Sequence, residues 1–189
     1  MGLSINIELS DNDLDHFTEV LKRAHQAAGT VDSHQITESA RKLLSEASGV
    51  KVPEFIGARL AKLEHLIDMV HDEGWGLQEE DKTRVLTALT YFADPKDVIP
   101  DSVPVVGYLD DAIVIELCVR ELKHELEAYE DFCAYRVEQA AAHGTDAATL
   151  GRADWMEDRR QELQERMRRR RERDSYVSSS RGSGLFAFR

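Results

Sequence analysis

Cysteine is scarce in this sequence, which has only Cys118 and Cys133 among 189 residues. Both fall in a segment whose pattern predicts one continuous helix, where a separation of 15 positions corresponds to roughly 22 Å at about 1.5 Å per residue. Because a disulfide needs Cα atoms closer than about 7 Å, the two thiols are not expected to pair. The sequence therefore argues against a disulfide-stapled secreted scaffold and predicts two reduced thiols in a cytoplasmic protein.

Basic residues are rare over most of the chain, and long apolar runs are missing. Residues 1–151 contain 13 Lys+Arg against 29 Asp+Glu, a net charge of −16, whereas residues 152–189 contain 11 against 7, a net of +4. An acidic body repels phosphate backbones, so any nucleic-acid contact would have to come from the C-terminal segment. The most apolar window, residues 98–119, contains four carboxylates and two prolines. A membrane span is therefore not expected, and neither is a signal peptide.

Proline and glycine, which interrupt helices, are also few, at 4 and 11 residues. Between them, apolar residues recur at helical spacing. The clearest apolar stripe consists of Ile56, Leu60, Leu63, Ile67 and Val70. We therefore expect a mainly α fold, a helical bundle, with helices over about residues 10–29, 32–47, 53–73, 78–93, 110–142 and 147–174.

The length suits one domain with an appendage. We expect an acidic helical domain over residues 1–146, a charged helix over residues 147–174 and a disordered tail over residues 175–189. The domain should begin with a short β-strand, because residues 3–9 alternate between apolar and polar side chains. One strand cannot satisfy its own edges, so this strand predicts a homodimer in which it pairs with its copy.

Three of the four prolines lie close together in "DPKDVIPDSVPVVGYLDD", residues 94–111. Proline fixes φ and removes an amide donor, so this segment must be a rigid corner between two helices. The structural residues of the corner are Pro95, Pro100, Pro104 and Gly107. Its aspartates Asp94, Asp101 and Asp110 are placed to cap short helical turns, Asp110 at the start of the long helix. On this interpretation no cofactor is needed.

A metal site is the alternative interpretation of the same corner. Folding could bring Asp97, Asp101, Asp110 and Asp111 within a few ångströms of one another. Four carboxylates at that distance would repel unless a cation lay among them, and oxygen ligands suit Mg²⁺, Mn²⁺ or Ca²⁺. The chain would then be a divalent-metal-binding protein or a metal-dependent enzyme.

The corner resembles a known family. The matching positions are Pro95, Asp97, Ile99, Pro100, Asp101, Pro104, Gly107, Asp110 and Asp111. They follow, in order and spacing, the PxDxIPDxxPxxGxxDD pattern of the YkvA family, domain of unknown function 1232, over about residues 83–125. The resemblance implies a helix, corner, helix hairpin at the centre of the bundle, and it implies no known activity. Many such proteins have apolar flanks, whereas the flanks here are charged, so membrane association is not expected.

Other candidate sites have weaker patterns. Glu121 with His124 and Asp68 with His71 have the i, i+3 spacing by which ferritin-like bundles hold two metals. Neither cysteine has an adjacent histidine signature, and no phosphate loop or nucleophile elbow occurs. The sequence therefore does not favour an enzyme.

The C-terminal helix is strongly basic, and its arginines are Arg168, Arg169, Arg170, Arg171 and Arg173. These could contact nucleic acid or another anionic surface. Alternatively, the helix is solvated and supported by i, i+4 pairs such as Glu162 with Arg166 and Glu165 with Arg169. A third possibility is docking on the acidic body of this chain or of a partner.

These observations favour a soluble cytoplasmic protein-protein interaction or adaptor module with an unknown protein partner. The divalent-metal protein and the nucleic-acid-associated protein are the alternatives, although the overall charge argues against nucleic acid. The closing "GLFAFR" could serve as a docking motif after its flexible spacer.

Overall fold

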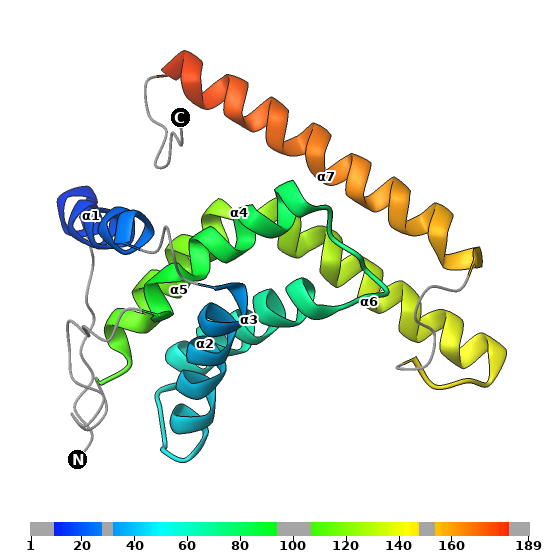
Figure 1. The fold of residues 1–189 in the computed structure, drawn as a ribbon, viewed down its shortest axis with the longest axis horizontal. Coiled ribbons are helices and arrows are strands. Elements are labelled where there is room, and N and C mark those ends of the chain that lie inside the picture. Colours follow the sequence, from blue (N-terminus) through cyan, green and yellow to red (C-terminus); the bar gives the residue numbers. More distant parts are fainter. Residues whose placement is uncertain (1–9, 28–31, 94–106, 148–153, 182–189) are drawn as a thin grey trace.

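The fold was analysed in a computed structural model, which describes residues 10–27, 32–93, 107–147 and 154–181. Within these ranges the regular structure is entirely helical, with seven α-helices and one 3₁₀ helix. The prediction of a mainly α fold is therefore confirmed (Figure 1). No strand occurs in the described ranges; the strand expected over residues 3–9, and the dimer contact based on it, lie outside them.

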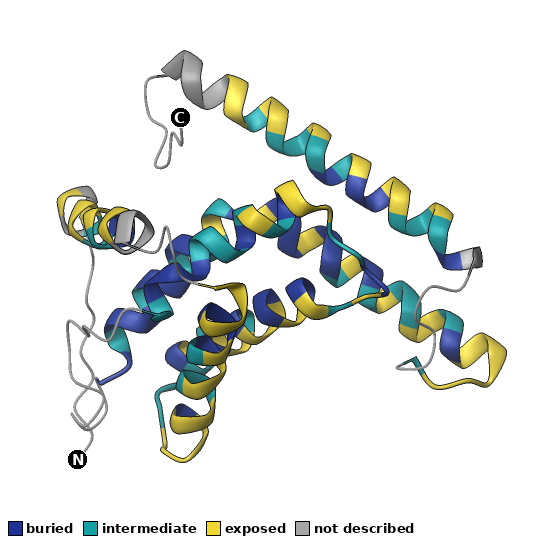
Figure 2. Cartoon of the chain, viewed as in Figure 1, coloured by how far each residue is buried: buried dark blue, intermediate teal, exposed yellow. Residues whose placement is uncertain are grey.

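The first half of the chain forms four helices close to the expected ranges. They are α1 (Asp11–Ala27), α2 (Ser33–Ser48), α3 (Glu54–His71) and α4 (Glu79–Leu89), and the last is extended by the 3₁₀ turn η1 (Thr90–Ala93). All five predicted stripe residues of α3 are buried. Leu66 and Met69, which lie beside that stripe, are buried as well. Helix α3 is thus covered on more than one side, with contacts to α2, α4, α5 and α6, and Figure 2 shows buried residues along it.

The long helix expected over residues 110–142 is instead two helices, α5 (Leu109–Glu121) and α6 (Lys123–His143). They meet at Leu122, whose φ of −99° and ψ of 21° bend the chain, and Figure 1 shows them at an angle to each other. The two helices pack on different partners: α5 packs on α3 and α1, whereas α6 packs mainly on α7. Leu122 itself is completely buried at the bend.

The last helix, α7 (Asp154–Arg181), continues seven residues beyond the expected end at residue 174. Residues 175–181, where the sequence predicts a disordered tail, are thus helical, and residues 182–189 lie outside the described ranges. Figure 1 shows α7 along α6, on the side away from α3. The helix is thus packed against the helical body and is not a separate, solvated appendage.

The described part of the proline corner is its C-terminal end. Gly107 and Tyr108 are buried, and Tyr108 is the N-cap residue of α5. The prediction that Asp110 is the N-cap is wrong, because Asp110 and Asp111 both lie in the first turn of the helix. There the positive end of the helix dipole favours negative charge. The prolines Pro95, Pro100 and Pro104 lie outside the described ranges.

The remaining whole-chain expectations concern thiols and membranes. Cys118 and Cys133 are both free, as predicted, and are now placed on α5 and α6. Among the helices in the described ranges, not one combines the length and apolar character that a membrane span requires.

Candidate functional site

Helix α7 docks through a narrow apolar stripe. Met156, Leu163 and Met167 are all buried, although the rest of the helix is strongly polar. Between them, Gln164 Nε2 donates a hydrogen bond to the backbone oxygen of Trp75 at 2.8 Å. The spacing of i, i+7 and i+11 keeps these side chains on one face. This stripe fixes the rotation of α7 and so decides which arginines face the body.

Two buried carboxylates lie beneath the side of α7 that carries these arginines. Asp81, in the first turn of α4, is 1% exposed, and Glu125, in the first turn of α6, is 0% exposed. Burying an ionised carboxylate is costly unless it is paired and hydrogen-bonded. Both acids must therefore obtain their compensation from neighbouring cations.

Arg171 joins the two carboxylates. Its Nη1 lies 2.7 Å from Asp81 Oδ1 and 2.9 Å from Glu125 Oε1. Burial acts to lower the pKa of Arg171, but its hydrogen bonds to the two acids outweigh this and raise the pKa above its ordinary value. Arg168 Nε adds a bond of 3.1 Å to Asp81 Oδ2, and Arg84 Nε adds one of 3.1 Å to Glu125 Oε1. Two arginines thus contact each buried acid.

The same docking surface continues along α6 toward solvent. Arg170 Nη1 lies 3.1 Å from Glu127 Oε2, and Arg166 pairs with Asp131. We refer to Asp81, Glu125, Glu127 and Asp131 together as the acidic face. Four arginines of α7 are paired with it, which supports the interpretation that the basic helix docks on the acidic body.

The solvated interpretation of this helix is therefore wrong for three of the five predicted arginines, Arg168, Arg170 and Arg171. Arg169 and Arg173 are the exceptions: each is 72% exposed and lies beside a carboxylate of its own helix. The predicted Glu165 to Arg169 pair is present at 3.7 Å. Glu162 pairs with Arg159 instead of Arg166. Of the five predicted arginines, only Arg169 and Arg173 are not paired with the acidic face and would be available to a nucleic acid.

A cavity of about 360 Å³ adjoins the acidic face between α1, α4, α5 and α7. Its lining residues are Leu21, Lys22, Glu80, Thr83, Arg84, Thr87, Ala88, Cys118, Glu121 and Arg171. Burial raises the pKa of Glu121, although its ion pair with Arg84 opposes the shift. Burial also raises the pKa of Cys118 to about 12, so this thiol is neutral at pH 7 and reacts slowly.

A second polar cluster is centred on Asp72, at the end of α3. Asp72 Oδ1 accepts hydrogen bonds from the amides of Gly74 at 2.9 Å and Trp75 at 3.1 Å. Its Oδ2 accepts one from the Tyr129 hydroxyl at 3.1 Å and lies 2.7 Å from Arg136 Nη1. The two amide contacts hold the turn between α3 and α4, and the contacts with Tyr129 and Arg136 attach that turn to α6. The role of this carboxylate is therefore structural.

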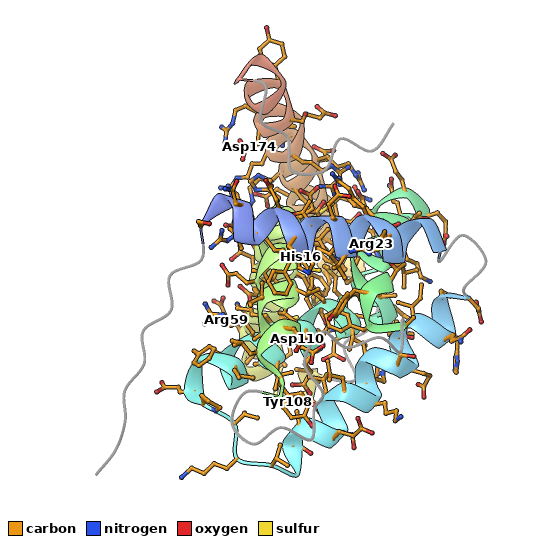
Figure 3. All side chains as sticks on the ribbon, turned by 90° about the vertical axis from the view of Figure 1, so that its left-hand side faces the viewer. His16, Arg23, Arg59, Tyr108, Asp110 and Asp174 are labelled. Atoms are coloured by element: carbon orange, nitrogen blue, oxygen red, sulfur yellow. The ribbon has the colours of Figure 1, made fainter. Side chains whose placement is uncertain are left out.

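The predicted metal residues fall into two groups. Asp110 and Asp111 are buried at the start of α5, and Figure 3 shows Asp110 toward the opposite end of the molecule from Asp174 of α7. Asp97 and Asp101 lie outside the described ranges, so the aspartate site remains a prediction. Over residues 10–27, 32–93, 107–147 and 154–181, no three His, Cys, Asp or Glu side chains form a metal-holding group.

The paired-helix metal hypothesis gains no support in the described ranges, where three of its four members have other partners. Glu121 pairs with Arg84, and His124 Nε2 lies 2.9 Å from Asp174 Oδ2. The hydrogen bond with His124 lowers the pKa of Asp174. Asp68 lies 4.0 Å from Arg41. These residues serve ion pairs between helices.

Sequence reasoning missed the three most important residues of the site, Asp81, Arg84 and Glu125. Each lies in an acidic or mixed segment in which charged residues normally face water. Their partners are 37 to 90 positions away. The one signal that pointed to them was the opposite charge of the body and of residues 152–189, which favoured docking without naming the acids.

Comparison with known proteins adds one finding. The family model described as "Protein of unknown function (DUF1232)" matches residues 81–117. No curated protein and no solved structure matches the chain. The matched segment begins at Asp81 of the acidic face and ends in α5. The resemblance drawn from the proline and aspartate pattern is thus confirmed as a match to this family model over residues 81–117.

Proposed function

We propose that this protein is a non-enzymatic interaction module whose acidic face binds an arginine-rich amphipathic helix. The observation that carries the proposal is the arrangement of Asp81 and Glu125, two fully buried carboxylates bridged by Arg171 of α7. In the present conformation the chain's own α7 covers the face. A partner helix with the same chemistry would compete for it.

The chemistry of the face selects its occupant. If α7 left, Asp81 would lose both of its arginines, Arg168 and Arg171, and Glu125 would keep only Arg84. Removing one member of a buried ion pair costs about 3 to 5 kcal/mol. An apolar helix could not offset that cost, whereas arginine meets carboxylates with a planar fork. After α7 leaves, the carboxylates of Asp81 and Glu125 would have to be hydrated by water or paired with the arginines of a second basic helix.

The occupant also needs an apolar stripe in register with its arginines. In α7, the buried Leu163 and Met167 lie about one turn before Arg168 and Arg171, respectively. A competing helix should therefore present a leucine or methionine pair one turn ahead of two arginines three positions apart. As part of the proposal, we place the protein in the cytoplasm, which the two free thiols support.

The test uses the full chain and a fluorescent peptide of residues 154–181. In the variant Arg168→Ala with Arg171→Ala, α7 loses its hold on the buried acids, so the peptide should bind the variant more tightly than the wild-type chain. Fluorescence anisotropy measures both affinities. Circular dichroism checks that the variant keeps its helices.

A matched peptide serves as the control. The same peptide with alanine at positions 168 and 171 should bind neither chain, because it lacks the two arginines that reach Asp81 and Glu125. Equal binding of both peptides to the variant would refute recognition through these arginines. Equal binding of the native peptide to both chains would refute competition with α7.

A divalent-metal protein that uses the aspartate corner is the alternative function. Among the described residues, its support is the burial of Asp110 and Asp111 together at the start of α5. A resident cation stabilises the folded state by mass action. Protein purified without chelator should then contain bound metal and unfold at a higher temperature with added Mn²⁺ or Mg²⁺. Background metal content together with an unchanged transition would remove this alternative.

A further inference from the structure

The cavity between α1, α4, α5 and α7 is not used by helix docking. Helix α1 forms one wall, and Figure 3 shows it lying across α5. Arg171 of α7, which pairs with the acidic face, also lines the cavity. At about 360 Å³ the cavity falls within the range of about 300 to 1,000 Å³ that is usual for small-molecule sites.

The inner wall of the cavity is apolar. Leu21 of α1 and Cys118 of α5 are buried, and Ala88 of α4 contributes a methyl group. The Cys118 thiol donates to the Ala88 backbone oxygen at 3.2 Å, so it presents no unsatisfied polar group. A hydrocarbon chain or small ring lying against Leu21, Ala88 and Cys118 would leave the Cys118 hydrogen bond intact.

Two arginines at the outer part of the cavity hold unused hydrogen-bond donors. Arg84 donates through Nε to Glu125 and through Nη2 to Glu121, and Arg171 donates through Nη1 alone. Over the residues that the structure describes, Arg84 Nη1 and Arg171 Nη2 have no acceptor. Because a guanidinium carries five N–H donors in a fixed plane, each ion pair orients the group and leaves some of its donors available.

The charge of the lining restricts which anion could use these donors. Glu80 and Glu121 also line the cavity, and Glu125 lies behind them. A dianion such as phosphate would be repelled by these acids, whereas one carboxylate can accept from a guanidinium fork. Lys22, which is half-exposed and paired with Glu19, adds a cation on the α1 side.

From this arrangement we propose that the cavity binds a small monocarboxylate with an apolar chain. The carboxylate lies between the free edges of Arg84 and Arg171, and the chain extends along Leu21, Ala88 and Cys118. The site uses donors and space that α7 docking leaves unoccupied, so it exists in the closed protein. It therefore does not depend on exchange of α7.

Octanoate is the probe, with octan-1-ol and inorganic phosphate as comparisons, all tested on the full chain. Isothermal titration calorimetry should show saturable octanoate binding. Octan-1-ol should bind about tenfold more weakly or less, because it lacks the charge-assisted hydrogen bonds. Phosphate should give no heat. Absence of octanoate binding at millimolar concentration, or equal binding of octan-1-ol, would overturn the proposal.

A matched pair of variants locates the site. Ala88→Leu fills the cavity and should abolish octanoate binding, whereas Ala61→Leu makes the same change on the exposed surface of α3 and should leave binding unchanged. Folded Ala88→Leu protein that binds octanoate normally would refute the location. If that variant does not fold, the wild-type chain still decides: bound octanoate should slow alkylation of Cys118 and leave that of Cys133 unchanged. Equal rates with and without octanoate would refute the proposal.

Discussion

Arg171 Nη1 lies 2.9 Å from Glu125 Oε1, across 46 positions of sequence, and the carboxylate that it contacts is fully buried. The same nitrogen reaches Asp81, so one guanidinium group connects α7 to both α4 and α6. Few surface ion pairs contribute measurably to stability, but a buried carboxylate that loses its cation is strongly destabilising. The most basic segment of the chain is therefore part of the folded core.

Replacing Arg171 with methionine tests that role. Met retains much of the apolar side-chain stem but removes hydrogen bonds to two charged, buried groups. We expect the free energy of unfolding to fall by about 2 to 3 kcal/mol, the magnitude of hydrogen bonds to charged groups. Urea unfolding followed by circular dichroism measures the change.

Arg169→Met is the matched control, two positions earlier on the same helix. Arg169 is 72% exposed and pairs only with Glu165, at 3.7 Å. Its replacement should change stability by less than about 0.5 kcal/mol. Equal losses for both variants would mean that α7 contributes through general charge and not through the buried bridge.

The sequence predicted the helices well where an apolar stripe was buried in the core. Ile56, Leu60 and Leu63 of α3 were identified from spacing alone, and all are buried. In α5 and α6, Leu117 and Phe132 are buried in the same way. Burial of one helical face is a local pattern that repeats every few residues, so a single sequence contains it.

The bend at Leu122 and the buried acids could not be predicted in this way. No proline or glycine marks the bend; it follows from α5 and α6 packing on different helices. Glu125 looks like any acid on a charged helix until Arg84 and Arg171 arrive from distant segments. Both features depend on tertiary contacts, which local spacing does not encode.

The pH dependence of stability should reveal the burial of Glu121. Burial raises its pKa above the usual 4.5, although Arg84 opposes this, and Glu125 adds to the rise. The folded state therefore holds the Glu121 proton more tightly than the unfolded chain does. The resulting stabilisation is fully present below about pH 4.5 and is lost as pH rises through the folded-state pKa.

Glu121→Gln isolates this contribution. The variant cannot ionise at position 121, so its stability relative to the wild-type protein should increase as pH rises from about 4.5 to 7. Urea unfolding at several pH values gives the difference, in which titrations shared by both proteins cancel. A difference that is flat or decreases with pH would contradict the raised pKa.

The two thiols should differ in reactivity. Cys118 is buried and its pKa is raised to about 12, so about one part in 10⁴ is thiolate at pH 8. Cys133 also has a raised pKa through burial, but its side chain is only partly covered. Iodoacetamide at pH 8 should therefore modify Cys133 first, as followed by mass spectrometry of peptides. Faster reaction of Cys118 would show that the wall formed by α1 opens readily.

Gln164 provides a test of α7 docking that does not involve charge. Its Nε2 donates to the Trp75 backbone oxygen at 2.8 Å inside the apolar contact. Gln164→Ala would leave that buried oxygen without its side-chain donor, at an expected cost of about 1 to 3 kcal/mol. Gln161→Ala is the control, because Gln161 is exposed and bonds only to Glu157 of its own helix, and it should cost less than about 0.5 kcal/mol. Urea unfolding compares the two. If Gln164→Ala is as mild as its control, the buried amide does not help to hold α7; if it is costly, the amide together with the apolar stripe determines the register in which the arginines reach the acidic face.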